Sequence, residues 1–159
     1  MSDIRKIDWN ERTEGYLDEM SNPYHAHRRK VLEAMIPESA LQPDSRIFDF
    51  GCGDGSFLPL FLDAGATVAG CDVAPGMIEV ARERLGKRYS FDGGLLAIGG
   101  VERLADLQDD SLDGMMALNV LAYLSSEEEH QFYEQARRTI RGEGGCWLPT
   151  PTRYSICSR

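Results

Sequence analysis

The feature that most constrains this chain is a short apolar run leading into three closely spaced glycines, RIFDFGCGDG. Residues 46–50 predict a buried β-strand, and Gly51, Gly53 and Gly55 follow it at every second position. Glycine permits backbone angles and close approaches that a Cβ would prevent. With a helix expected at 55–64, the pattern predicts a sharp strand-to-helix turn whose backbone is bare.

A bare turn of this kind suits either a ligand or simply tight packing. The N–H groups at the start of the following helix lack partners within it, so they favour a carboxylate or phosphate. The next predicted strand, 66–72, ends in Asp72, which in a parallel sheet would lie beside the glycines. Its carboxylate could accept hydrogen bonds from ribose hydroxyls, cap the helix expected at 75–86, or do both. These patterns predict a nucleotide-like ligand, with a ligand-free turn as the alternative.

Short apolar strands and helical periods alternate along the rest of the chain, which predicts parallel β-α-β units. The helix expected at 125–141 has Ser126 and Glu129 at capping-box spacing, with acids in its first turn and arginines in its last. The predicted fold class is therefore α/β, with a doubly wound, mainly parallel sheet. Its remaining strands are expected at 95–100, 112–120 and 144–150.

The chain before the first strand is predicted to be a helical appendage. Apolar residues at helical spacing indicate an amphipathic helix lying against the sheet. These residues are Val31, Leu32, Met35 and Ile36. We expect residues 1–40 to form this N-terminal segment and residues 41–159 to form one ligand-binding domain.

Composition narrows the function classes. The chain has 159 residues, 42% of them hydrophobic, and a formal net charge of -9, which argues against a basic surface for nucleic acid or anionic lipid. No apolar stretch approaches the roughly 18 residues of a membrane span, and the start lacks a signal-peptide core, so a cytoplasmic protein with small-molecule partners is expected. The four cysteines show no C-x-x-C spacing, which predicts neither a metal site nor a disulfide framework.

Four stretches taken together resemble the successive motifs of class I S-adenosylmethionine-dependent methyltransferases, over roughly residues 40–150. They are FDFGCGDGSFL, GCDVAPGMIEVARERL, SLDGMMALNVLAYL and RRTIRGEGGCW. Nicotinamide-binding folds use a similar turn but typically space their glycines G-x-G-x-x-G, whereas this chain has G-x-G-x-G. The resemblance implies a Rossmann-like fold and S-adenosyl-L-methionine as the cofactor.

The resemblance also implies roles for particular residues. Gly51 and Gly53 would lie against the methionine part of the cofactor, with Asp49 near its amino group, and Asp72 would hold the ribose hydroxyls. Asn119, after the fourth strand, would face the sulfonium and the acceptor. The full set of implied cofactor-binding residues is Asp49, Gly51, Cys52, Gly53, Asp72, Val73, Met77, Val101 and Asn119. Of these, Val73 and Met77 would pack near adenine.

Two positions depart from the family pattern. Gly100 stands where relatives often carry an acid that contacts the adenine amino group, which leaves adenine to the backbone and Val101. Ala122 and Tyr123 replace a frequent Glu-His pair, which removes an obvious histidine base, and Tyr123 is expected in the core or at the rim of the site.

An N-terminal helix often covers this cofactor in the family, so residues 1–40 could act as a lid. Tyr16 and Tyr24 would then line the lid or merely anchor its packing. His25 and His27 are candidate bases for a hydroxyl acceptor, with solvated histidines beside a basic run as the alternative.

The family sheet has seven strands, the last two forming a hairpin, but only PTPTRYSICSR follows Leu148. We therefore expect five strands, a missing C-terminal antiparallel hairpin and a truncated chain that self-associates through an uncovered fifth strand. The expected function is methyl transfer from S-adenosyl-L-methionine to a small-molecule acceptor. The alternatives are a non-catalytic cofactor-binding remnant and a nicotinamide-dependent oxidoreductase, and no catalytic residue is assigned.

Overall fold

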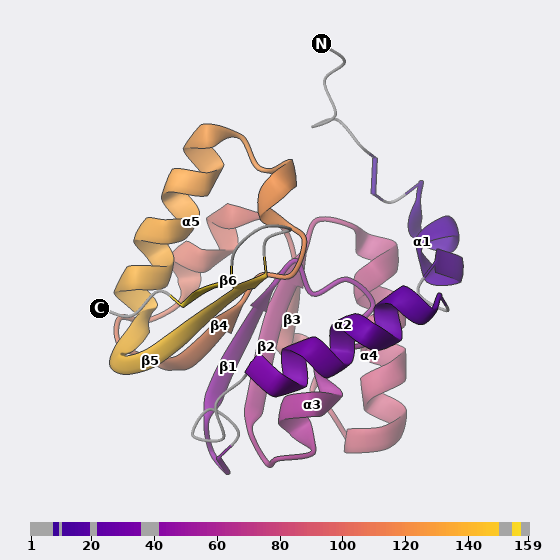
Figure 1. Cartoon of the computed structure of the whole chain (residues 1–159), viewed down its shortest axis with the longest axis horizontal. Helices are drawn as coiled ribbons and strands as arrows, with labels where there is room; N and C mark the ends of the chain where they lie inside the picture. Colours follow the sequence, from indigo (N-terminus) through magenta and orange to yellow (C-terminus); the bar gives the residue numbers. More distant parts are fainter. Residues whose placement is uncertain (1–7, 10, 20–21, 36–41, 150–153, 157–159) are drawn as a thin grey trace.

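A computed structural model describes residues 8–9, 11–19, 22–35, 42–149 and 154–156 of the chain (Figure 1). The helices are α1 (Thr13–Glu19), α2 (Pro23–Met35), α3 (Pro59–Leu62), α4 (Pro75–Tyr89) and α5 (Ser126–Thr139), with short 3₁₀ helices η2 (Gly93–Leu95), η3 (Val101–Asp106) and η4 (Leu121–Tyr123). The strands are β1 (Arg46–Phe50), β2 (Thr67–Asp72), β3 (Leu96–Ile98), β4 (Leu112–Met116), β5 (Ile140–Pro149) and β6 (Tyr154–Ile156).

The strands form one sheet in the order β3-β2-β1-β4-β5-β6. β1 to β5 pair in parallel, and the chain order reverses at β1, from which β2 and β3 extend one way and β4 and β5 the other. The predicted α/β, doubly wound sheet is confirmed. Its reversal point lies next to the glycine turn, where ligands of open α/β sheets bind.

The sheet has one strand more than the sequence predicted. β6 pairs antiparallel with β5, matching Trp147, Leu148 and Pro149 to Ile156, Ser155 and Tyr154. The expectation of five strands with the fifth uncovered is therefore wrong over this stretch, because residues 154–156 supply an antiparallel neighbour. The predicted self-association through a bare fifth strand loses its basis there.

Apolar clusters fill both faces of the sheet, as a parallel sheet requires. Ile47 points to the face covered by α3 and α4, where it joins Leu58, Phe61 and Ile78. Phe48, the next residue of β1, points to the opposite face under η3 and α5. Figure 1 shows α5 on one side of the sheet and α3 and α4 on the other.

Several element boundaries differ from the prediction. α3 contains four residues instead of the ten expected at 55–64, because the chain after Gly55 continues in turns that end only at Leu58. β5 begins at Ile140, directly after α5, rather than at 144. The sequence pattern did not predict α1, whereas α2 confirms the predicted N-terminal helix. The side chains of Leu32, Met35 and Ile36 lie outside the described residues.

The capping box of α5 lies one residue earlier than predicted. The Ser125 hydroxyl accepts from the Glu128 N–H at 3.2 Å, and the Glu128 carboxylate accepts from the Ser125 N–H at 2.7 Å. The adjacent serines and the three successive glutamates allow two serine–glutamate pairs at capping-box spacing, so the sequence alone does not choose between them. The helix that begins after Ser125 is the one whose Phe132 and Ala136 pack into the core.

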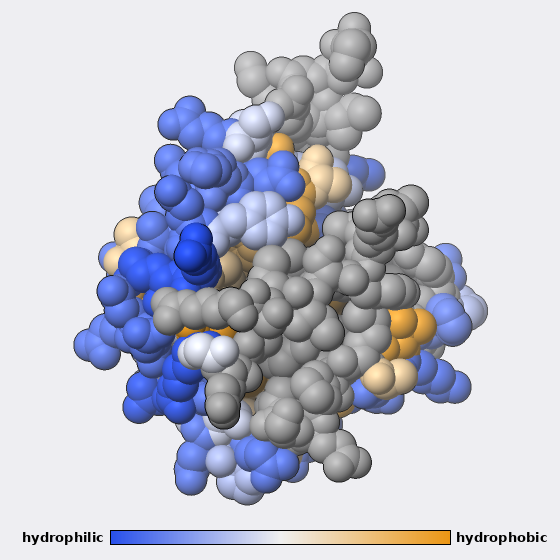
Figure 2. Space-filling view, turned by 60° about the vertical axis from the view of Figure 1, so that its left-hand side comes forward, coloured by the Kyte–Doolittle hydropathy of each residue, from blue (hydrophilic) through white to orange (hydrophobic). Residues whose placement is uncertain are grey.

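Hydrophilic side chains cover the side of the molecule formed by α5 (Figure 2). None of the described helices combines the length and the apolar character that a membrane crossing requires.

Candidate functional site

A cleft of about 300 Å³ opens at the carboxyl ends of the central strands. One part of its wall, here called the loop half, comes from the ends of β1, β2 and β3. The loop half consists of Gly51, Gly53, Asp72, Val73, Met77, Gly99, Gly100 and Val101. The other part, here called the aromatic half, comes from the N-terminal segment and the chain after β4. The aromatic half consists of Trp9, Tyr16, Asn119, Tyr123, Leu124 and Glu128.

The glycine turn lines the cleft with backbone, as predicted. The N–H groups of Gly51 and Cys52 donate to the Cys71 carbonyl oxygen at 2.8 and 3.0 Å, which ties the turn to the end of β2. Gly53 has φ +52°, and a Cβ placed on it would meet no atom within 4 Å. Gly53 is therefore the position where the absence of a side chain leaves room in the cleft.

The other two glycines of the turn serve packing. A Cβ on Gly51 would lie 2.8 Å from the Val120 Cβ, and one on Gly55 would lie 3.1 Å from the Ala81 Cβ. Both have positive φ. Gly51 thus brings the turn close to the chain after β4, and Gly55 brings it close to α4. The predicted helix N-terminus does not adjoin the turn, because α3 begins only at Pro59.

Asp72 joins the glycine turn to the start of α4. Its Oδ2 accepts from the Gly53 N–H and its Oδ1 accepts from the Ala74 N–H, both at 2.9 Å. Burial raises the pKa of Asp72, and hydrogen bonds from the backbone of Ala74, Gly53 and Val73 oppose that rise. The carboxylate does not cap α4 in the strict sense, because the N-cap residue is Ala74, whose own side chain makes no capping hydrogen bond, and Asp72 accepts from the N–H of Ala74 itself.

Asp49 lies behind the turn rather than in the wall of the cleft. Its side chain is 2% exposed, and among the described residues its Oδ1 finds no hydrogen-bond partner. Burial raises the pKa of Asp49 well above its usual range, and the nearby carboxylates of Asp72 and Asp54 add to the rise. A buried carboxyl oxygen without a partner is costly, so the Asp49 Oδ1 calls for a hydrogen-bond donor that the described residues do not supply.

A buried ion pair fastens the turn to α4. Asp54 is 2% exposed, its Oδ1 accepts from the Ser56 N–H at 3.1 Å, and its Oδ2 lies 2.8 Å from the Arg84 guanidinium. Three carboxylates, Asp49, Asp54 and Asp72, thus surround the turn. Arg84 neutralises one of them, while Asp72 receives backbone N–H groups.

Cys52 is buried behind the turn and does not reach the cleft wall. Burial, more than any other cause, raises the pKa of its thiol, as it raises the pKa of Cys71 to about 12. Both are free thiols kept protonated in the core. The side chains of Cys146 and Cys157 lie outside the described residues.

Beyond Asp72 the wall of the loop half is apolar. Val73 is 56% exposed on one side, and the Gly100 backbone approaches it from β3, with a Cβ on Gly100 reaching within 3.5 Å of the Val73 Cγ1. Met77 and Val101 are largely buried and belong to the same part of the cleft wall. The Glu102 carboxylate accepts from the Gly100 N–H at 2.8 Å, so an acid lies beside the position where the sequence lacks one.

The chain after β4 crosses from one half of the cleft to the other. Asn119 is exposed in the cleft with φ +57°, a left-handed conformation that asparagine tolerates better than most residues. Tyr123 follows on η4 and is half-buried at the rim, one of the two places expected for it.

Trp9 is a cleft residue that the sequence did not reveal. Its ring lies edge-to-face with Tyr123, with centroids 4.8 Å apart, and edge-to-face with Tyr16, at 6.2 Å. Tyr16 was a candidate for this role and does line the cleft. His27 is exposed and outside the cleft wall, and the side chains of Tyr24 and His25 lie outside the described residues.

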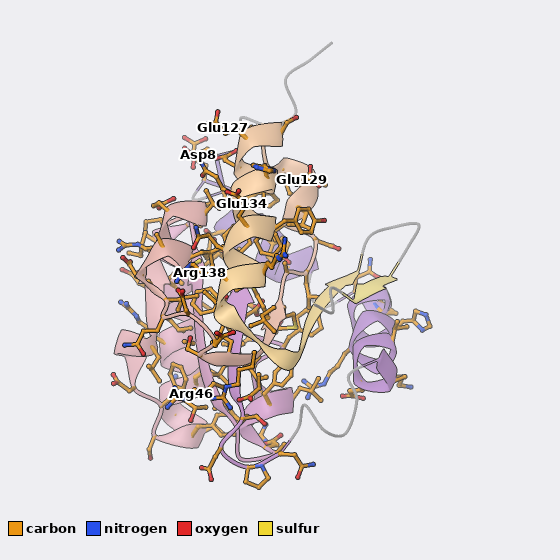
Figure 3. All side chains as sticks on the ribbon, turned by 90° about the vertical axis from the view of Figure 1, so that its left-hand side faces the viewer. Asp8, Arg46, Glu127, Glu129, Glu134 and Arg138 are labelled. Carbon is orange, nitrogen blue, oxygen red and sulfur yellow. The ribbon has the colours of Figure 1, made fainter. Side chains whose placement is uncertain are left out.

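Glu128 was also missed. It lines the aromatic half while its carboxylate completes the capping box of α5, and its hydrogen bonds to Ser125 lower its pKa. Figure 3 shows its neighbours Glu127 and Glu129 in the first turn of the same helix, with Arg138 near the opposite end. A charge pattern at a helix start gave no sign that one of the three glutamates faces a cleft.

Comparison with known proteins places this geometry in a family. The family model described as "Methyltransferase domain" matches residues 48–148, more than half of the chain. The chain is 29% identical over 146 residues to a malonyl-[acyl-carrier protein] O-methyltransferase of Acetivibrio thermocellus, covering 74% of this chain and 51% of that protein. It is 31% identical over 108 residues to a ubiquinone biosynthesis O-methyltransferase of Xanthomonas campestris pv. campestris, covering 67% and 44%.

Solved structures share the fold. A Haemonchus contortus phosphoethanolamine N-methyltransferase, solved with phosphoethanolamine and S-adenosylhomocysteine, superposes with a TM-score of 0.68 at 19% identity, over 93% of this chain and 32% of that one. The match spans only about half the length of each of the two methyltransferases named above.

The chain belongs to the class I S-adenosylmethionine-dependent methyltransferase family. The family match covers the glycine turn, the acid at the end of β2 and most of the parallel part of the sheet, and it ends before β6.

Proposed function

We propose that the protein binds S-adenosyl-L-methionine in the cleft and transfers its methyl group to a small-molecule acceptor. The observation that carries this proposal is the pair of carboxylates at the glycine turn. Asp49 is buried behind the turn with an unpartnered Oδ1, and Asp72 lies in the cleft wall, where its Oδ2 accepts from the Gly53 N–H. S-Adenosylmethionine carries an ammonium group and a ribose diol, which are the donors that two such carboxylates require.

The remaining residues of the loop half fit the other parts of the cofactor. Gly53 leaves space where a side chain would obstruct the methionine portion. The surface formed by Val73, the Gly100 backbone, Met77 and Val101 is apolar and includes exposed backbone, which suits one face of adenine. Asp72 would accept from the ribose hydroxyls while keeping its backbone bonds to Gly53 and Ala74, because a carboxylate has more acceptor positions than those two bonds use.

When bound, the cofactor supplies an activated methyl group on a sulfonium. The contribution of this chain is then to hold the acceptor in line with that methyl group and to exclude water. Asn119 and the rings of Trp9, Tyr16 and Tyr123 lie where an acceptor beside the loop half would bind. We propose that residues 1–40 act as a lid through Trp9 and Tyr16.

The test is isothermal titration calorimetry with S-adenosylhomocysteine, beside NADH, followed by a turnover assay with methyl-labelled S-adenosylmethionine across hydroxyl and amine acceptors. We expect saturable one-site binding of S-adenosylhomocysteine and none of NADH. Binding without methyl transfer would identify a non-catalytic cofactor-binding protein. Binding of NADH alone would overturn the proposal in favour of an oxidoreductase.

A further inference from the structure

The two halves of the cleft differ in what they can recognise. The loop half presents backbone, an apolar surface and Asp72, all of which the proposed cofactor would contact. The aromatic half presents ring surfaces and the Glu128 carboxylate. If the proposed function holds, the aromatic half is the part of the cleft left for the acceptor, so its chemistry selects the acceptor.

Three rings give this half an apolar surface. Trp9 makes edge-to-face contacts with Tyr16 and Tyr123, so the rings stand roughly perpendicular to one another, with interplanar angles of 90° and 85°. Edge-to-face packing holds each ring in place through the neighbour's quadrupole. The electron-rich faces of such rings favour a flat apolar group or a cation and disfavour an anion.

The charges of the cleft also favour a cation over an anion. Among its described lining residues the ionisable carboxylates are Asp72 in the loop half and Glu128 in the aromatic half, and there is no lysine, arginine or histidine. Glu128 is held in position by its reciprocal hydrogen bonds with Ser125, and these bonds lower its pKa, so the group is ionised at neutral pH. The whole chain carries a formal charge of -9. A carboxylate or phosphate on the acceptor would meet a negative carboxylate, and none of the described lining residues supplies a cation to offset it.

We infer that the acceptor enters the aromatic half as a ring-sized group that is cationic or uncharged, and that Glu128 determines this selection by charge. The inference rests on the proposed function. The order of preference that follows is cation, then neutral molecule, then anion.

Three probes of matched size test the order in protein saturated with S-adenosylhomocysteine, at neutral pH and low ionic strength. They are benzylamine, benzyl alcohol and benzoate, with dissociation constants from ligand-observed NMR. One unit of charge on a probe bound beside Glu128 is expected to change its affinity about fivefold relative to the neutral probe, because the cleft is exposed to water. Benzylamine should therefore bind about fivefold more tightly than benzyl alcohol, and benzoate about fivefold more weakly.

A matched pair of variants isolates Glu128 from the overall charge of the protein. Glu128→Gln removes the charge but preserves the capping box, since glutamine serves at this position. Glu129→Gln makes the same change in net charge on an exposed neighbour outside the cleft wall (Figure 3). Glu128→Gln should reduce the ratio of benzylamine affinity to benzoate affinity about 25-fold, because both fivefold contributions come from the Glu128 charge. Glu129→Gln should leave that ratio nearly unchanged, and its melting temperature serves as the folding control.

The outcomes are separable from those of the proposed function. Failure of wild-type protein to bind S-adenosylhomocysteine would remove the proposed function, and the inference with it. Normal binding of S-adenosylhomocysteine with benzoate bound as tightly as benzylamine, or with no ring probe bound, would overturn the inference alone. Equal effects of the two variants would overturn the role of Glu128. The wild-type arms decide the acceptor class even if Glu128→Gln does not fold.

Discussion

The loop half and the aromatic half of the cleft are built in different ways. The loop half is fixed by short-range backbone geometry and hydrogen bonds: the turn after β1 is tied to the end of β2 through Cys71, and Asp72 accepts from the Gly53 N–H. The aromatic half is assembled from segments far apart in sequence, which meet through ring contacts between Trp9 and Tyr123. Changes to the loop half should therefore affect binding of S-adenosylhomocysteine most, and changes to the aromatic half should act chiefly on the acceptor.

The largest effect is expected from Gly53→Val. A β-branched side chain opposes φ +52° and would fill the open space above the turn. Calorimetry should show S-adenosylhomocysteine affinity lowered by at least about 100-fold, or roughly 2.7 kcal/mol. Gly86→Val is the control, since Gly86 lies in α4 with no atom within 4 Å of an added Cβ, and affinity should persist there. Normal S-adenosylhomocysteine binding by Gly53→Val would mean that the glycine turn does not contact the ligand.

Asp72→Ala comes next. Loss of its carboxylate removes the partner proposed for the ribose hydroxyls and leaves the Gly53 and Ala74 N–H groups without their acceptor. We expect affinity to fall by about 1–3 kcal/mol and the free energy of unfolding by about 1 kcal/mol. Calorimetry measures the first and urea unfolding the second. Unchanged affinity in a folded variant would remove Asp72 from the binding site.

A smaller effect should follow from breaking the ion pair that fastens the turn to α4. Arg84→Met leaves Asp54 buried without its cation, although Arg84 is itself 43% exposed, so we expect a loss of about 1–2 kcal/mol of unfolding free energy. Lys87→Met on the same helix breaks the exposed pair with Glu83 and should cost clearly less, because solvent screens that pair. Equal losses in urea unfolding would show that the buried pair does not stabilise the turn.

The smallest effect on cofactor binding is expected from Trp9→Leu in the aromatic half. It removes the ring contacts with Tyr16 and Tyr123, each worth about 0.5–1.5 kcal/mol. S-Adenosylhomocysteine affinity should fall less than about threefold, while benzyl alcohol affinity should fall more. A Trp9→Leu variant that loses S-adenosylhomocysteine binding as completely as Gly53→Val would erase the distinction between the two halves.

The sequence predicted the loop half because its determinants are local. Gly53 and Asp72 each follow a strand whose apolar run is easily recognised, and parallel strands bring their carboxyl ends together. Periodicity could not show which glycine faces open space and which packs against Val120 or Ala81, since that depends on contacts from distant segments.

The aromatic half could not be predicted for the same reason. Nothing local to Trp9 indicates that its ring reaches Tyr123, and the role of Glu128 depends on which serine caps α5. The strand after β5 was overlooked because three residues, Tyr154–Ile156, are too few to give a clear alternating pattern.

The most direct test of the account concerns Asp49, the buried carboxyl for which a ligand cation is proposed. The pKa of Asp49 is raised in the folded protein. The contribution of the protonated carboxyl to the free energy of unfolding is therefore fully present below the pKa of the unfolded chain, about 3.9. That contribution is lost as the pH rises through the pKa of the folded protein. Asp49→Asn should therefore stabilise the free protein at neutral pH, by about 1–3 kcal/mol, and this gain should disappear below about pH 4.

The same substitution should weaken binding, because an amide cannot neutralise an ammonium group. The measurement is the free energy of unfolding and the S-adenosylhomocysteine dissociation constant of Asp49→Asn beside wild type, at neutral pH. We expect Asp49→Asn to have a higher free energy of unfolding than wild type and to bind S-adenosylhomocysteine at least about tenfold more weakly. A variant that is more stable and binds S-adenosylhomocysteine as tightly as wild type would contradict it.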